Sequence, residues 1–176
     1  MLKKIFIGVA AFIGIFLIVA ALQPNDFRVT RSITIAAEPA AIFPHINNPK
    51  LFHEWNPWAK IDPKAKETYE GPSEGVGSKM SWEGNNEVGK GGMTNIESRP
   101  NEFVKFDMEF IAPMAGRSIA EFTLYQKGSE TVVTWSMYGP KNFIAKAFGL
   151  FMSCDDMIGG QFEKGLANLK AITESK

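Results

Sequence analysis

The stretch that decides the fold is residues 131–169, TVVTWSMYGPKNFIAKAFGLFMSCDDMIGGQFEKGLANL. Its first part alternates, because Val133, Trp135 and Met137 fall on one face of an extended chain. After Gly139-Pro140 the apolar period changes to 3.6, which is the period of a helix with one apolar stripe. The stripe comprises Phe148, Phe151, Met152, Asp155, Ile158, Phe162, Leu166 and Leu169. The stretch therefore predicts a last strand followed by a long C-terminal helix.

The predicted helix contains two kinds of interruption. Ser153, with Asp156 three residues later, has the residue types of a capping box, so the helix has a candidate break there. Gly159, Gly160 and Gly165 each cost about 1 kcal/mol in a helix relative to alanine. Such a cost indicates either close approach of the helix to the sheet or local mobility.

Period-two alternation also fills the chain before this stretch. It is clear in Phe27–Ile35 and in Val104–Phe110, where apolar and polar residues take turns. Within residues 67–138 the strands are separated by well-marked turns. These turns are Gly71-Pro72, Gly84-Asn85-Asn86, Arg99-Pro100-Asn101 and Lys127-Gly128-Ser129. We therefore expect an antiparallel sheet with one apolar face and one wet face.

Short helices are predicted between the first strand and the rest of the sheet. Glu38-Pro39 and Pro49 each have the residue types of a helix start, whereas Pro57 and Pro63 are predicted to bracket a loop. The order is then strand, two short helices, about six strands and one long helix. This is an α+β architecture in which the sheet and the last helix must cover each other's apolar faces.

The N-terminus carries an apolar stretch, Ile5–Leu22, without a charged residue or a proline. As a helix it would be about 27 Å long, close to the ~30 Å hydrocarbon thickness of a bilayer. Lys3 and Lys4 precede it, so the positive-inside tendency predicts a cytoplasmic N-terminus and a domain exported to the periplasmic or extracellular side. We expect a single-pass membrane protein with an anchor and linker over residues 1–25 and one folded domain over residues 26–176. A cleaved signal peptide is the alternative, because Val19-Ala20-Ala21 has the small residues of a cleavage site.

Composition excludes several classes of protein. The 176 residues include 19 Lys+Arg and 19 Asp+Glu, and this absence of net charge argues against a polybasic nucleic-acid-binding protein. The content of 45% hydrophobic and 12% aromatic residues excludes a disordered chain. A single cysteine excludes an internal disulfide framework, and two histidines supply no convergent ligand set. We therefore expect no metal, no cofactor and no nucleic-acid partner.

Several local strings resemble those of a known superfamily. They are Trp55-Asn56-Pro57-Trp58, Tyr69-Glu70-Gly71-Pro72, Met80-Ser81-Trp82-Glu83-Gly84, residues 131–137 and residues 162–170. With the element order, they resemble the helix-grip fold of the START-like superfamily, also called SRPBCC, and most of all its polyketide cyclase/dehydrase and lipid-transport type. The resemblance covers nearly all of residues 27–174. It implies a sheet of about seven antiparallel strands wrapped around the long C-terminal helix. It also implies a cavity between them, which members use as lipid carriers, hormone receptors, cyclases, coenzyme Q-binding proteins or chaperone co-activators.

Aromatic and methionine side chains are the candidate ligand-binding residues. On the sheet side or at its mouth they are Trp55, Trp58, Trp82, Phe106, Met108, Phe110, Phe122, Trp135 and Met137. Phe148, Phe151 and Met152 of the helix stripe are predicted to face them. These residue types line adaptable apolar sites, and a buried tryptophan needs a partner for its indole N–H. The alternative for each residue is ordinary core packing.

Two charged residues complete the predicted site. Asp155 falls in the apolar stripe, where desolvation would raise its pKa and make it a candidate acid or polar anchor. A helix-cap role is its alternative. Arg31 falls on the apolar parity of the first strand, where it could pair with Asp155 or bind an anionic head group. Its alternative is a strand-end arginine that reaches water by its long stem.

The sequence therefore favours membrane-tethered binding of an apolar or amphipathic, lipid-like molecule, oriented by Arg31, Asp155, Tyr138 and tryptophan N–H groups. A cyclase or dehydrase that uses the same cavity is one alternative, and it needs a positioned acid or base. A protein-interaction domain of the co-chaperone kind is another. That domain would have a filled core and an apolar patch outside.

Overall fold

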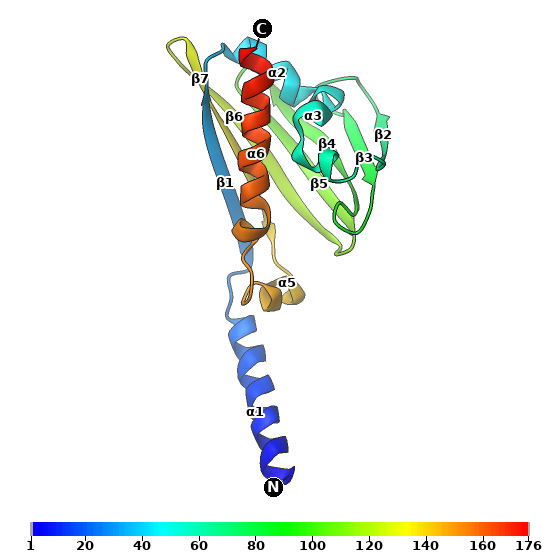
Figure 1. The fold of residues 1–176 in the computed structure, drawn as a ribbon, viewed down its shortest axis with the longest axis vertical. Helices are drawn as coiled ribbons and strands as arrows, with labels where there is room; N and C mark the ends of the chain where they lie inside the picture. Colours follow the sequence, from blue (N-terminus) through cyan, green and yellow to red (C-terminus); the bar gives the residue numbers. More distant parts are fainter. Residues whose placement is uncertain (1, 176) are drawn as a thin grey trace.

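The computed structural model of the protein describes residues 2–175. Within them lies one antiparallel sheet of seven strands in the order β1-β7-β6-β5-β4-β3-β2 (Figure 1). The strands are β1 (Asp26–Ile35), β2 (Lys66–Glu70), β3 (Lys79–Glu83), β4 (Lys90–Arg99), β5 (Phe103–Ala112), β6 (Gly116–Lys127) and β7 (Glu130–Pro140). The helices are α1 (Leu2–Ala21), α2 (Pro39–Asn47), α3 (Pro49–Trp55), α4 (Pro57–Ile61), α5 (Phe143–Phe148) and α6 (Cys154–Glu174). The order and the layers confirm the predicted helix-grip α+β fold.

The long helix α6 lies along β1 and packs on the inner face of the sheet, which is the face that carries the predicted apolar parity (Figure 1). Its contact with the sheet is an aromatic stack. The Trp135 ring lies between Phe162 of α6, at a centroid distance of 4.0 Å, and Phe122 of β6, at 4.9 Å. Gly165 makes this approach possible, because a Cβ atom there would lie 2.9 Å from the Trp135 ring. The predicted close approach of helix and sheet is confirmed at Gly165.

Three short helices cover another part of the inner face. Phe52 of α3 contacts Phe106 and Phe122 of the sheet, with ring centroids 6.2 and 6.1 Å apart. The first residue of each of these helices is a proline. The expected loop after Pro57 is wrong, because α4 occupies it. The Asn56 side chain caps that helix by accepting a hydrogen bond from the Trp58 amide.

The predicted break in the C-terminal helix is confirmed. The chain forms α5, leaves helical geometry after Phe148, and restarts as α6 with Ser153 as the N-cap. Ser153 and Asp156 form a reciprocal capping box, in which each side chain accepts a hydrogen bond from the other residue's backbone amide. Two donors that α6 would otherwise leave unpaired are thereby satisfied.

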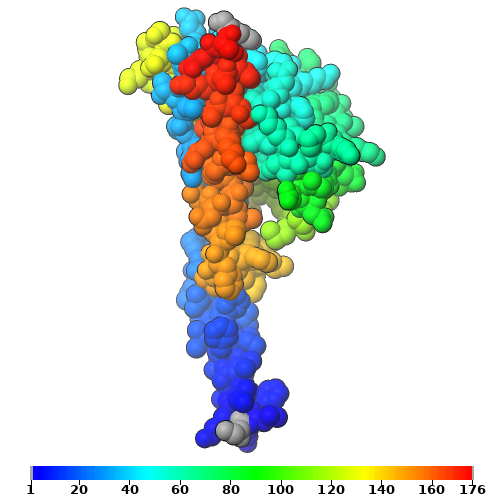
Figure 2. All heavy atoms as spheres, in the orientation of Figure 1, coloured from blue at the N-terminus to red at the C-terminus, as the bar shows by residue number. Residues whose placement is uncertain are grey.

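Helix α1 extends away from the folded domain (Figures 1 and 2). Of its described residues, only Ala20 is buried. Over residues 2–175 it is the one helix long and apolar enough to cross a membrane. A signal sequence has the same length and composition, so α1 fits both roles considered for the N-terminus.

The helix–sheet contact predicts opposite effects for two glycine substitutions in α6. Gly165→Ala should lower the free energy of unfolding by about 1–3 kcal/mol, because the new methyl group overpacks Trp135. Gly160→Ala should raise it by about 1 kcal/mol, because a Cβ at Gly160 meets no atom within 4 Å and alanine favours the helix. Urea unfolding of the full chain in detergent, followed by tryptophan fluorescence, measures both. Equal effects of the two substitutions would contradict this packing.

Candidate functional site

One end of the inner face is left partly uncovered. Strand register places Phe110 opposite Gly91 of β4, and Gly91 opposite Trp82 of β3. Gly91 has no side chain to separate them, so the Trp82 ring lies across β4 and meets Phe110 edge-on at a centroid distance of 6.1 Å. Trp82, Met108 and Phe110 pack against the core yet remain partly exposed.

Small residues continue this surface on the next strand. Gly116 of β6 pairs with Phe110, and Ser118 pairs with Met108. A Cβ atom built on Gly116 meets no atom within 4 Å, so the space in front of it is open. We call Trp82, Met108, Phe110 and Gly116 the open end of the inner face, whereas Ser118 beside them is buried. Figure 2 shows a recess in the molecular surface between α6, drawn in orange, and the strands drawn in green.

The middle of the inner face is closed by aromatic packing. The residues predicted to line a cavity there are buried: Trp55, Phe106, Phe122, Trp135 and Met137. The Trp135 and Phe162 rings stack at a centroid distance of 4.0 Å, so no ligand fits between these two rings. The ligand-binding role of these five residues stays a prediction. The same holds for Trp82, Met108 and Phe110, which differ from the five in being partly exposed.

Trp135 differs from the other buried tryptophan in one respect. The indole N–H of Trp55 donates a hydrogen bond to the His45 carbonyl at 2.8 Å. The indole of Trp82 likewise donates to the Val88 carbonyl at 3.3 Å. Trp135 is 4% exposed, and its indole nitrogen has no acceptor among the described residues. Such an unpaired buried donor costs roughly 1–3 kcal/mol, so an acceptor that reaches it would stabilise the complex.

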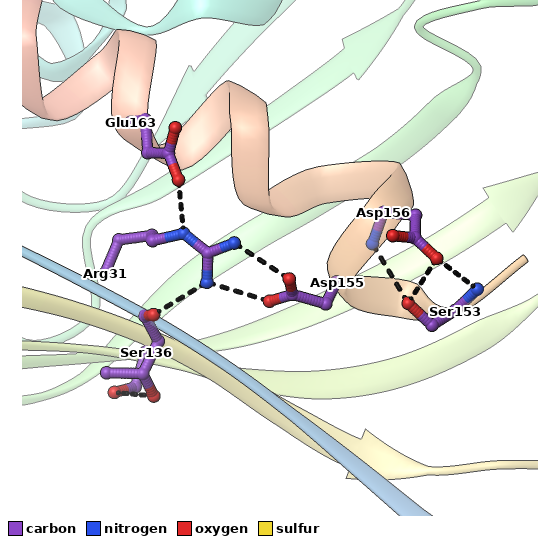
Figure 3. A network of polar contacts seen from close by, with 7 residues as sticks. Arg31, Ser136, Ser153, Asp155, Asp156 and Glu163 are labelled. Atoms are coloured by element: carbon purple, nitrogen blue, oxygen red, sulfur yellow. Dashed lines mark hydrogen bonds and ion pairs between the residues drawn. The ribbon is translucent and has the colours of Figure 1, made fainter.

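An ionic cluster fastens the start of α6 to β1 (Figure 3). Arg31 donates two hydrogen bonds to the Asp155 carboxylate, at 2.8 and 2.9 Å, and a third to Glu163 at 2.6 Å. A Cβ atom at Gly159 would lie 2.3 Å from the guanidinium, so this glycine is the second place where α6 approaches the sheet closely. The predicted pairing of Arg31 with Asp155 is confirmed.

The electrostatics of this cluster correct one expectation. The Asp155 side chain is 53% exposed, and hydrogen bonds from the Arg31 guanidinium hold the pKa of its carboxyl below the ordinary value. The expected rise of its pKa by desolvation is therefore wrong. Asp155 stays ionised and serves as an anchor for Arg31, and it is not a general acid in this arrangement.

Tyr138 lies on the other face of the sheet. Its hydroxyl donates to Glu121 at 2.5 Å, and the Arg28 guanidinium stacks over its ring at 4.0 Å. The expectation that Tyr138 orients a ligand beside Trp135 is wrong, because successive strand residues point to opposite faces and Met137 takes the inner position.

Three helix-stripe residues also lie elsewhere than expected. Phe148, Phe151 and Met152 are exposed, and they lie in α5 and the segment after it. The break before Ser153 turns this part of the chain away from the sheet, so these residues do not face Trp82 or Phe110. Phe151 instead contacts Phe16 of α1, with ring centroids 6.0 Å apart.

A polar trio at the edge of the inner face was not predicted. The His53 imidazole bonds through Nδ1 to one Glu67 oxygen at 2.7 Å, and the Tyr69 hydroxyl donates to the other at 2.5 Å. Partial burial, followed by the Glu67 carboxylate, raises the pKa of the Tyr69 phenol. Glu67 pairs directly with Trp82 across β2 and β3. Alternation could have placed Glu67 and Tyr69 on one face, but only the register brings them beside Trp82 and His53.

The outer face carries a groove of about 760 Å³, which the sequence did not indicate. Its lining carries both signs of charge, and two ion pairs form within it, Lys90 with Glu83 at 3.1 Å and Arg117 with Glu109 at 3.6 Å. A groove with mixed and paired charges offers little apolar contact. It is therefore a poorer match for a lipid-like molecule than the open end of the inner face.

The seven-stranded antiparallel sheet, the long C-terminal helix on its apolar face and the short helices between β1 and β2 define a helix-grip protein. A match to a family model then identifies the family of this chain. Residues 26–174 match the family described as polyketide cyclase / dehydrase and lipid transport. The chain belongs to this family, which confirms the resemblance in its sequence strings. The family indicates a fold suited to binding hydrophobic ligands.

Solved structures agree with this assignment of the fold. Protein MLL2253 from Mesorhizobium loti is 16% identical, with 85% of this chain and 98% of that chain covered and a TM-score of 0.61. Ginseng major latex-like protein 151 from Panax ginseng is 12% identical, with 85% and 99% covered and a TM-score of 0.58. The Aha1 dimer from Colwellia psychrerythraea is 18% identical, with 84% and 96% covered and a TM-score of 0.56. No curated protein matches the sequence.

The ionic cluster predicts acid-sensitive stability. The Asp155 pKa is lowered in the folded state, so its contribution is fully present above the unfolded value of 3.8 and fades as the pH falls through the folded value. Asp155→Asn should therefore lower the urea midpoint at about pH 6 and have a smaller effect at about pH 3. Glu102→Gln, in the exposed turn between β4 and β5, is the control. A difference from wild type that is the same at both pH values would contradict the role of this carboxylate.

Proposed function

We propose that this chain binds an apolar or amphipathic, lipid-like molecule at the open end of the inner face, while α1 holds the domain at a membrane. The observation that carries this proposal is the partly exposed set Trp82, Met108 and Phe110 beside the open space at Gly116. Membership of the polyketide cyclase / dehydrase and lipid transport family supports it.

The binding energy would come from apolar contact. A ligand that covers about 200 Å² of apolar surface gains roughly 5 kcal/mol before the costs of immobilisation. Trp82 and Phe110 meet edge-on, so their faces leave a corner against which a flat ring or an acyl chain can lie. Methionine at 108 adds a side chain that adapts to irregular shapes.

Polar groups would orient the ligand at two places. The unpaired Trp135 N–H favours a ligand with a carbonyl or hydroxyl oxygen that reaches past the open end into the core. Arg31 retains its charge but is engaged by Asp155 and Glu163, so an anionic head group would have to compete with both carboxylates. We therefore assign the first orienting role to Trp135.

The membrane tether is the second part of the proposal. Helix α1 is long enough to span the hydrocarbon, and the linker before β1 is short. Lys3 and Lys4 at its start favour a cytoplasmic N-terminus and an exported domain. A tether raises the local concentration of membrane-derived ligands around the open end of the inner face.

An apolar fluorescent probe tests the ligand site directly. Full-length protein in detergent-free nanodiscs should bind a fluorescent fatty acid, and Trp82→Ala or Phe110→Ala should weaken binding about tenfold or more. The reason is that loss of one well-covered aromatic side chain removes roughly 1.5–3 kcal/mol of apolar contact.

The matched control is Tyr125→Ala. Tyr125 is 70% exposed on the outer face of β6, so the substitution removes an aromatic ring from the same sheet without touching the site. Probe affinity should stay at the wild-type value. Equal losses for Tyr125→Ala and Trp82→Ala, or no probe binding by the wild type beyond that of empty nanodiscs, would contradict the ligand site.

An enzyme of the cyclase or dehydrase kind is the second candidate, and one observation favours it. His53, Glu67 and Tyr69 form a hydrogen-bonded trio next to Trp82, which supplies a base and a proton donor at the rim of the same surface. Glu67 is 17% exposed in its side chain, so its charge is partly shielded from water. A proton-transfer reaction on a bound apolar substrate would have its acid and base here.

Native mass spectrometry of protein extracted from its own membrane separates the two candidates. If the chain is a carrier, wild type and Glu67→Gln should hold a co-purifying lipophile of the same mass. If it is an enzyme, the variant should accumulate a substrate whose mass differs from that of the molecule on the wild type. Glu70→Gln, in the same strand but paired with Lys79, is the control and should match the wild type.

A further inference from the structure

The segment that contains α5 is the most apolar exposed surface outside α1. Over residues 143–152, which we call the α5 segment, Phe151 is 79% exposed, Phe148 61% and Ile144 58%. Phe143 and Met152 are also exposed. Such side chains gain free energy when they are buried, so a contiguous exposed surface of this kind indicates an interaction site.

The position of the α5 segment relative to α1 is set by direct contacts. The Phe151 ring meets the Phe16 ring with centroids 6.0 Å apart. On the same segment, the Lys146 ammonium donates to the Asn25 side chain at 2.5 Å and to the Ala21 carbonyl at 3.5 Å. An aromatic contact and a polar contact therefore join the α5 segment to two different levels of α1.

These two levels match the layers of a bilayer. Helix α1 has 20 residues, which gives about 30 Å of length, equal to the ~30 Å thickness of the hydrocarbon. Phe16 lies five residues before the end of α1, or about 7.5 Å below it. When α1 spans the membrane, Phe151 beside Phe16 is at the depth of the acyl chains. Lys146, beside Ala21 and Asn25, is at the boundary where long basic side chains place their charge.

We propose that the α5 segment is a second membrane contact, inserted into the headgroup and outer acyl region of the leaflet that holds the C-terminal end of α1. The partner is the phospholipid bilayer itself. This inference rests on the membrane tether of the proposed function. A protein partner is disfavoured, because a surface that touches Phe16 can be covered only by something that also lies beside α1 within the membrane.

The insertion bears on ligand exchange. The α5 segment lies between α1 and the lower ends of the strands (Figure 1), and it connects β7 to α6 at the end of the domain nearest α1. Membrane insertion there brings a bilayer-derived molecule to the domain without transit through water.

Spin-label depth measurements test this inference on the full chain. In a Cys154→Ala background, Phe151→Cys, Met152→Cys, Ile13→Cys and Tyr125→Cys each receive a nitroxide, and the protein is reconstituted into phosphatidylcholine vesicles. Oxygen concentrates in lipid and a nickel chelate in water, so their relative relaxation effects report depth. Labels at 151 and 152 should favour oxygen, as should the label at 13 in the middle of α1. The label at 125, on the outer face of β6, should favour nickel.

The outcomes separate the two proposals. Lipid exposure at 13 with water exposure at 151 and 152 would overturn membrane insertion of the α5 segment and leave the tether standing. Water exposure at 13 would overturn the tether and, with it, the inference. Shielding of 151 and 152 from both reagents would show burial against protein, either a second copy or another partner, and would also overturn lipid insertion.

Discussion

The rest of the structure depends on how closely α6 can approach β1 and β7. The helix meets the sheet closely at two glycines. A Cβ atom at Gly165 would overlap the packed Trp135 ring, and one at Gly159 would displace the Arg31 guanidinium. Beside Gly165 the Trp135 and Phe162 rings stack at 4.0 Å. Two glycines in one helix cost about 2 kcal/mol in helix propensity, and the stack and the ion pairs must offset that cost.

The position of α6 along β1 determines which part of the inner face of the sheet stays uncovered. The helix lies along β1, and α2 to α4 lie over part of the remaining inner face (Figure 1). Trp82, Met108 and Phe110 stay partly exposed beside these layers. A closed core would need a bulky residue opposite these side chains. Strand β6 instead has small residues there, Gly116 opposite Phe110 and Ser118 opposite Met108. In the proposed function, the packing that closes the middle of the sheet would restrict a lipid-like ligand to the open end of the inner face.

Alternation and turn residues were sufficient to predict the sheet and the final helix, because period two and period 3.6 are local properties of the chain. The apolar period continues through Phe148, Phe151 and Met152 even though the helix does not, so the stripe alone placed these residues on the sheet. The Ser153–Asp156 capping box was the signal that the path changes there. Register is a long-range property, and the pairing of Glu67 with Trp82 could not be read from spacing. Asn56-Pro57 also has the residue types of a capped helix start, which is why α4 forms in place of the predicted loop.

A single spanning helix would fix the height of the domain but not its orientation, because the chain between α1 and β1 can rotate about its single bonds. The α5 segment removes that freedom, since Lys146 binds Asn25 in this linker and Phe151 binds Phe16 below it. A second contact with the bilayer, beside α1, would restrict rotation of the domain about the axis of α1. With both proposed membrane contacts in place, the open end of the inner face would keep a nearly constant angle to the lipid surface. Such an orientation would favour the proposed exchange of an apolar molecule, because Trp82 and Phe110 would keep a constant position relative to the lipid surface.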